Sequence, residues 1–104
     1  MKYKVSLSQK AKNDLIGIYR HIADVLLSPI NAEKQLDRLY DSISSLDEMP
    51  ERFRIYDIEK WHGRNLRVMP VNNYLVFYVP DPDKQNVTVV RILYGGQDVD
   101  DLLE

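Results

Sequence analysis

Basic and aromatic side chains gather between residues 60 and 67, where they could act on a polyanion. Five of them fall within eight positions: Lys60, Trp61, His62, Arg64 and Arg67. Cationic groups bind phosphates and carboxylates, and histidine can transfer a proton near neutral pH. We interpret Lys60, Trp61, His62 and Arg64 as candidate contacts to RNA or to a protein partner. The alternative is structural, with Trp61 anchoring the core or its rim and His62 as an ordinary loop histidine.

Arg91 and Tyr94 add to this set from a second place in the chain. Arg91 interrupts the apolar run 87–93, and Tyr94 follows that run directly. If Arg67, Arg91 and Tyr94 share one face of a sheet, they could hold a phosphate or a carboxylate-rich partner. Charges inside strands are usually paired, so the alternative is a structural ion pair of Arg91, for example with Asp57 or Glu59. The sequence leaves both interpretations open.

Other kinds of chemistry find little support in the sequence. The chain has no cysteine, which excludes disulfides and thiolate metal sites. Its two histidines lie far apart without ligand spacing, so we expect no metal site. We recognise no nucleophilic triad or glycine-rich phosphate loop, and the adjacent carboxylates Asp100 and Asp101 lie in the tail. We therefore expect no cofactor.

The composition is that of an ordinary globular protein of 104 residues with a formal net charge of −2. We expect residues 1–104 to form a single domain. The slight acidic balance disfavours a general nucleic-acid binder. The basic segments 1–20 and 52–80 could still meet on one face, or they could belong to a mixed, solvated surface. No apolar run approaches the roughly 20 residues that cross a bilayer, so we expect a cytoplasmic protein with no membrane contact.

Three apolar runs in the C-terminal half predict three antiparallel strands. The runs cover residues 66–71, 74–80 and 87–93. Asn72-Asn73 joins the first two, and asparagine tolerates the positive φ of a tight hairpin. The polar segment 81–86 predicts a second hairpin loop. The middle run is apolar without alternation, which is typical of a central strand covered on both faces.

The N-terminal half predicts one strand and two helices. Apolar and polar residues alternate over residues 2–7, as in a half-buried strand. Ser8 is suited to cap a helix whose apolar stripe runs through positions 11, 15, 18, 22 and 25–26. Ser28-Pro29 begins a second helix, with an apolar seam through positions 32, 36, 39, 43 and 46 and an end at Met49-Pro50. The segment 52–63 is either a short strand or a packed loop, and residues 98–104 form at most one helical turn.

The predicted fold class is therefore α+β in the order β-α-α-β-β-β, with an antiparallel sheet packed by an N-terminal helical hairpin. Together with the residue patterns, this order resembles the RelE/ParE superfamily of toxins from type II toxin–antitoxin systems. The resemblance covers nearly the whole chain. It rests on residues 3–11 with Asp14-Leu15 and Ile18-Tyr19, on Pro50-Glu51-Arg52, on residues 67–78 and on residues 87–98. It implies a growth-inhibiting toxin, neutralised by a cognate antitoxin that lays an extended or helical tail across it.

Two mechanisms divide the superfamily. RelE-like members cut messenger RNA on the ribosome, whereas ParE-like members poison DNA gyrase without a nuclease centre. This sequence departs from the RelE pattern at Leu75 and at Gly96-Gln97, where basic residues are usual, and its C-terminal segment is acidic. The resemblance thus favours gyrase as the partner. The alternatives are a ribosome-dependent mRNA endonuclease, with Arg67, Arg91 and Tyr94 as catalytic residues, and a non-toxic member that still binds the antitoxin.

Overall fold

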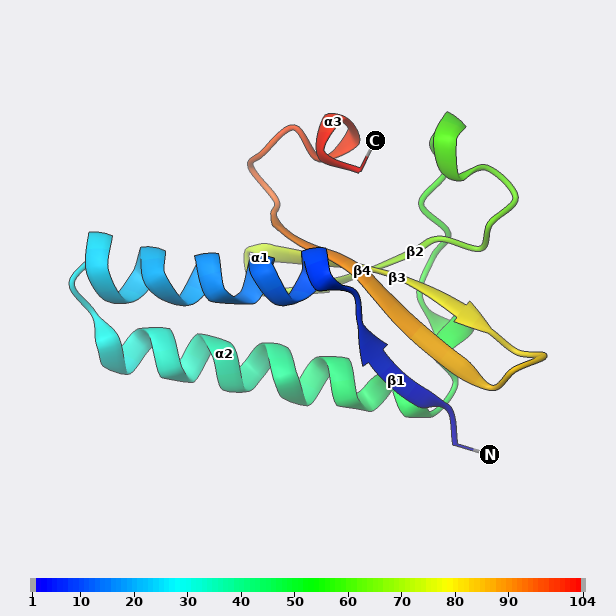
Figure 1. Cartoon of the computed structure of the whole chain (residues 1–104), viewed down its shortest axis with the longest axis horizontal. Coiled ribbons are helices and arrows are strands. Elements are labelled where there is room, and N and C mark those ends of the chain that lie inside the picture. The colour runs from blue at the N-terminus through cyan, green and yellow to red at the C-terminus, as the bar shows by residue number, and fades with distance from the viewer. Residues whose placement is uncertain (1, 104) are drawn as a thin grey trace.

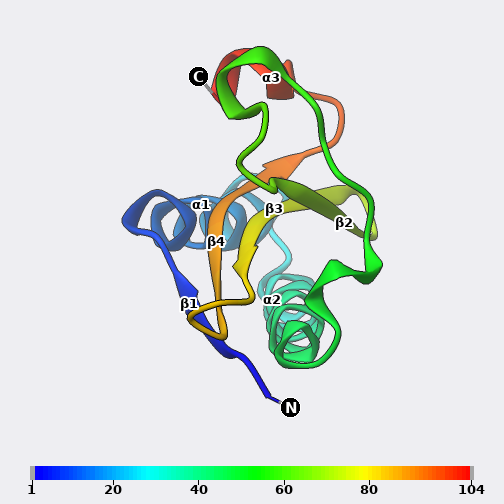
Figure 2. The same cartoon turned by 90° about the vertical axis from the view of Figure 1, so that its right-hand side faces the viewer.

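The computed structural model describes residues 2–103, and it has one sheet with cover on both faces (Figures 1 and 2). Its elements follow the predicted order and confirm the α+β class. They are β1 (Lys4–Leu7), α1 (Gln9–Arg20), the π-helix η1 (His21–Val25), α2 (Pro29–Ser44), the 3₁₀ turns η2 (Ser45–Asp47), η3 (Pro50–Arg52) and η4 (Glu59–Trp61), β2 (Arg67–Val71), β3 (Tyr74–Asp81), β4 (Asn86–Tyr94) and α3 (Val99–Leu102).

The four strands lie in the order β1-β4-β3-β2. β2, β3 and β4 form the predicted antiparallel meander. β1 instead pairs in parallel with β4, from Lys4 opposite Asn86 to Leu7 opposite Val89. The sheet is therefore mixed at this edge, because the helical hairpin carries the chain across the sheet before it returns in β2. Alternation of apolar residues marks β1 as a strand but does not specify its partner.

Two local predictions are confirmed at the ends of the strands. Asn72 adopts a φ of +54° in the two-residue turn between β2 and β3. The Ser8 hydroxyl accepts the N–H of Ala11 at 3.1 Å, as an N-cap does. The same hydroxyl donates to the carbonyl of Val90 at 2.9 Å, where the β3–β4 register shifts. Ser8 therefore ties the start of α1 to β4 as well as capping the helix.

The helices α1 and α2 run side by side and project beyond the sheet (Figure 1). Their buried faces join the inner side of the sheet in one core, as the apolar stripes predict. Two details differ from the prediction. α2 ends at Ser44 and continues as a 3₁₀ turn, so Met49 lies outside it in a left-handed conformation with φ of +47°. The stripe of α1 also stops early, since Val25 and Leu26 are exposed. The π-helix η1 ends with the N–H of Leu26 donating to the carbonyl of His21, so the 3.6-residue spacing of the stripe no longer applies to these two residues.

A second, smaller core covers the outer face of the sheet. Leu66, Val68, Phe77 and Leu93 are buried there against Leu103 of the C-terminal segment. Figure 2 shows α3 beside the segment that precedes β2, both on the side of the sheet away from α2. That segment is a packed loop with a single antiparallel bridge, from residue 55 to residue 67. β3 is thus central and covered on both faces, as predicted.

The two basic segments of the sequence do not meet along the sheet. β1, which carries the N-terminal lysines, forms one edge of the sheet. The loop before β2 bridges to the opposite edge. These two parts of the basic segments thus lie at opposite edges of the sheet, and a shared basic face stays a prediction. None of the helices within residues 2–103 is long and apolar enough to cross a membrane.

Candidate functional site

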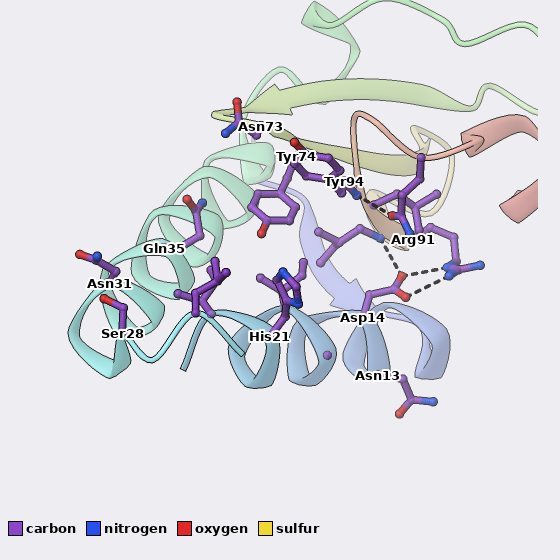
Figure 3. Close-up of a pocket in the computed structure, with 17 residues that line it drawn as sticks. Asn13, Asp14, His21, Ser28, Asn31, Gln35, Asn73, Tyr74, Arg91 and Tyr94 are labelled. Atoms are coloured by element: carbon purple, nitrogen blue, oxygen red, sulfur yellow. Dashed lines mark hydrogen bonds and ion pairs between the residues drawn. The ribbon is translucent and has the colours of Figure 1, made fainter. Parts of the chain in front are cut away.

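The guanidinium of Arg91 is held by an aspartate from α1. Its Nε lies 2.8 Å and its Nη2 3.0 Å from the two carboxylate oxygens of Asp14 (Figure 3). Its Nη1 donates to the backbone carbonyl of Leu102 at 2.7 Å. All three nitrogens are therefore engaged, and the hydrogen bonds that Arg91 donates to Asp14 raise the pKa of Arg91. Both side chains are largely buried, at 19% and 14% exposure.

The sequence suggested a structural ion pair for Arg91, and the structure contains one with a different partner. Asp57 and Glu59, the carboxylates considered from the sequence, lie in the loop before β2. Asp57 contacts His62 instead. Asp14 also accepts the backbone N–H of Ile92 at 2.9 Å, so it closes the part of the β4 edge that the short strand β1 leaves open. A carboxylate that satisfies a side chain and a backbone donor together is better placed than one on a distant loop.

Arg67 also has a partner for each of its three guanidinium nitrogens, and all of these partners precede it in the chain. Its Nη1 donates to the carbonyls of Glu51 and Phe53 at 2.9 and 2.7 Å. Its Nε donates to the side-chain oxygen of Asn65 at 3.0 Å, and its Nη2 lies 3.4 Å from the carboxylate of Glu51. The side chain is only 14% exposed. In this geometry Arg67 holds the η3 turn against β2.

The three residues proposed for a nuclease centre do not share one face of the sheet. Arg91 is opposite Phe77, and Arg67 is opposite Tyr78. Neighbouring residues of a strand point to opposite faces, and Phe77 and Tyr78 indeed belong to the outer and inner cores. Tyr94 pairs with the first residue of β3, four positions and about 13 Å from Tyr78 along the strand. The condition of one shared face is therefore not met, because Arg91 lies on the face opposite to Arg67.

The loop 60–64 has one packed residue among exposed ones. The indole Nε1 of Trp61 donates to the carbonyl of Leu103 at 2.9 Å, which fixes the C-terminal segment over the outer core. The guanidinium of Arg64 lies 4.3 Å from the centre of the Trp61 ring. His62 Nδ1 lies 3.0 Å from Asp57, and this hydrogen bond raises the pKa of His62 above its ordinary value of 6.5. Trp61 is thus an anchor of the rim, while Lys60, His62 and Arg64 are exposed.

A groove of about 890 Å³, here called the hairpin groove, lies between the helical hairpin and the end of β4 (Figure 3). Its walls come from α1, η1 and α2, and Tyr74 and Tyr94 close it with their rings 5.9 Å apart. Burial, and secondarily Tyr94, raises the pKa of Tyr74. Asp14 and Arg91 are the charged side chains among its lining residues, and they neutralise each other. The remaining polar lining is neutral and rich in amides: Asn13, Ser28, Asn31, Gln35, Asn73 and Gln97, with His21 beside them.

A second groove, here called the outer groove, lies on another side of the helical hairpin and has a volume of about 600 Å³. It is mostly apolar, with Lys12, Arg20 and Asp24 as its charged residues. Its apolar lining comes from β1, α1 and α2: Leu7, Leu15, Ile16, Tyr19, Leu36 and Tyr40. The sequence singled out neither groove, because each combines residues from elements whose relative positions only the fold establishes. Within residues 2–103 no group of three or more histidine and acidic side chains is placed to hold a metal ion.

The fold is shared with chains of solved type II toxin–antitoxin systems. A chain of the chromosomal ParDE system from P. aeruginosa superposes with a TM-score of 0.72 and 17% identity, covering 89% of this chain and 96% of that one. A chain of the RelBE2 toxin–antitoxin complex from Mycobacterium tuberculosis gives 0.67 and 16%, with 90% and 92% covered. A chain of the archaeal RelE–RelB complex from Pyrococcus horikoshii gives 0.61 and 16%, with 93% and 99% covered. At these identities the likeness concerns the fold alone.

A match to a family model identifies the kind of toxin more closely. Residues 5–99 match the family described as the ParE toxin of the type II toxin–antitoxin system parDE. The protein therefore belongs to the ParE family of type II toxins, within the RelE/ParE superfamily that its sequence resembles. A comparison with curated proteins finds no significant match.

Proposed function

We propose that this toxin arrests growth by binding a protein target, DNA gyrase, and not by cutting RNA. The observation that carries the proposal is the hydrogen bonding of Arg67 and Arg91, the two arginines that a nuclease would need. Every guanidinium nitrogen of Arg67 and of Arg91 is occupied by the protein itself, and the two side chains lie on opposite faces of the sheet. The match to the ParE family supports the same mechanism.

Ribonuclease action places stricter demands on a site. Cations must converge on one phosphate, and an acid or base must reach the attacking or leaving oxygen. An arginine that already binds a carboxylate or several carbonyls would have to give up those contacts before it could bind RNA. Binding to ribosomal RNA would also need many phosphate contacts, whereas the net charge of the chain is −2. Binding to a protein target requires neither cations that converge on one phosphate nor many phosphate contacts.

The alternative of an mRNA endonuclease keeps one favourable observation. Lys60, His62 and Arg64 are exposed in one short loop, and His62 has a raised pKa. Tyr94 is also about half exposed. These groups could contact RNA, so the experiment must be able to detect cleavage.

We also propose that a cognate antitoxin neutralises the protein by covering the outer groove. The structural relatives are parts of toxin–antitoxin complexes, which supports an antitoxin partner. Disordered segments that fold on binding are rich in charged residues, and their amphipathic helices lay an apolar face into a groove. The outer groove offers apolar side chains with Lys12 and Arg20 among them, which suits an acidic amphipathic segment.

Pulse labelling of DNA and protein synthesis tests the proposed function. The chain is induced in bacteria without its antitoxin, and both rates are followed over the first minutes. We expect DNA synthesis to fall while translation continues. Early loss of translation, with mapped cuts in ribosome-bound messages, would overturn the proposal in favour of the endonuclease. Normal growth at high expression would indicate the non-toxic alternative.

A further inference from the structure

The turn between the two helices carries an apolar surface that nothing in residues 2–103 covers. Four side chains form this hairpin tip, with exposures of 66%, 60%, 83% and 69%: Val25, Leu26, Leu27 and Ile30. Figure 1 shows the turn between α1 and α2 at the end of the projecting hairpin, away from the sheet. Contiguous exposed apolar side chains on a small protein usually mark a binding surface.

The backbone at the tip is also unusual. The last turn of the first helix is a π-helix, in which the N–H of Leu26 donates to the carbonyl of His21. Single π-turns occur frequently at functional sites. Leu27 follows with a φ of +52°, a left-handed conformation that suits glycine or asparagine and is unfavourable for leucine.

The hairpin tip is continuous with the hairpin groove. Leu26 belongs to both, and the groove runs from Ser28 and Asn31 at the turn to Tyr94 at the end of β4. The surface therefore offers a projection and an adjoining cavity. Apart from His21, its side chains carry no unpaired charge, because residues 25–32 contain no charged side chain and Arg91 is paired with Asp14 inside the groove. Nucleic acid would need unpaired cations at such a surface. An acidic segment finds cations on the outer groove instead, at Lys12 and Arg20.

We propose that the hairpin tip and the hairpin groove together bind the protein target of the toxin, through a neutral apolar patch on that target. This inference rests on the proposed function, in which the toxin acts by binding a protein. It separates two surfaces of one helical hairpin by their charge. The charged outer groove takes the antitoxin, and the neutral tip with its groove takes the target. Leu27 is the central contact, since it is the most exposed apolar side chain of the tip.

Leu27→Asn is a sharp test, because asparagine tolerates the left-handed conformation and removes only the apolar contact. The chain offers a matched control in Met49. Met49 is also apolar, 75% exposed and left-handed, with φ of +47°, but it lies before η3 and outside both grooves. Purified wild-type, Leu27→Asn and Met49→Asn proteins are compared for inhibition of DNA supercoiling by purified gyrase, and for growth arrest at equal expression. Circular dichroism and thermal melting check that both variants fold.

We expect Leu27→Asn to need about tenfold more protein for half-inhibition, or more, and Met49→Asn to match the wild type. A triple variant that adds Leu26→Ser and Ile30→Ser should lose inhibition and growth arrest altogether. If folded Leu27→Asn and the folded triple variant inhibit as the wild type does, the inference is overturned while the proposed function stands. If the variants stay toxic but a co-expressed cognate antitoxin no longer rescues growth, the tip belongs to the antitoxin and the inference is again overturned. A wild-type chain that neither inhibits gyrase nor arrests growth would overturn the proposed function and this inference together.

Discussion

The carboxylate of Asp14 binds Arg91 through both of its oxygens, although the two residues lie 77 positions apart in sequence. One of these oxygens also accepts the N–H of Ile92. The first turns of α1 are thereby fixed to the far half of β4, beyond the point where β1 ends. Because the same α1 forms a wall of the hairpin groove, this contact sets the shape of the groove as well as the stability of the fold.

Replacing Asp14 with alanine should destabilise the protein by about 3 kcal/mol, because it leaves a largely buried guanidinium and a backbone N–H without their acceptor. Asp14→Asn should cost less, since an amide oxygen can still accept one of these bonds. Urea denaturation followed by circular dichroism measures both changes. Asp41→Ala, on the exposed face of α2, serves as the control and should stay within about 0.5 kcal/mol of the wild type. A similarly small loss for Asp14→Ala would contradict the structural role.

Arg67→Lys should also destabilise the fold, by about 2 kcal/mol. Lysine keeps the charge but cannot reach two carbonyls and an amide oxygen in one plane, so the carbonyls of Glu51 and Phe53 lose a donor. We expect the variant to remain toxic at temperatures where it is folded, because the proposed function does not require Arg67 to contact the target. Thermal melting measures the loss of stability, and a growth assay at low temperature measures the toxicity of the folded variant. Loss of toxicity without loss of stability would instead support a direct role in RNA cleavage.

Local features of the fold could be predicted from the sequence because short-range physics determines them. The Asn72-Asn73 hairpin, the cap at Ser8 and the apolar seam of α2 each depend on a few neighbouring residues, and all three are present in the structure. The π-helix is also local, but the apolar spacing of residues 18–26 looks like an ordinary helical stripe. That is why Val25 and Leu26 were predicted to be buried and are exposed.

The arrangement of the candidate site could not be predicted in the same way. The partners of Arg91 depend on the parallel pairing of β1 with β4 and on the irregularity at Val90, and neither is encoded in a periodic pattern. The partners of Arg67 are mainly backbone carbonyls, which every residue has and which no sequence motif marks. The exposure of Leu27 does have a sign in the sequence. Leu27 ends an apolar run directly before a Ser-Pro turn, where the chain leaves the helix and offers its last residue no buried position.

The pair formed by His62 and Asp57 should be visible as a raised histidine pKa. Their hydrogen bond is 3.0 Å long and both side chains are well exposed. A titration followed by NMR should give a His62 pKa above 6.5 that falls back when Asp57 is changed to asparagine. Glu59→Gln, a neighbouring carboxylate without this hydrogen bond, should leave the His62 pKa much closer to its wild-type value. Stabilisation by the pair is present below the unfolded pKa and is lost as the pH rises through the folded pKa, but exposure keeps it small. An unshifted His62 would show that the contact does not persist in solution.

Tyr78 should make the protein sensitive to alkali. Its side chain is completely buried, its hydroxyl donates to the carbonyl of Pro50 at 2.6 Å, and burial raises its pKa from 10.0 to about 12. The folded state therefore binds this proton more tightly than the unfolded state. The resulting stability is complete below pH 10 and is lost as the pH rises towards 12. Tyr78→Phe should remove this part of the alkaline loss, while costing about 1–2 kcal/mol at neutral pH because the Pro50 carbonyl loses its donor. Urea denaturation at pH 7, 10 and 11 compares the two proteins, and an equal alkaline loss in both would assign the sensitivity to another group.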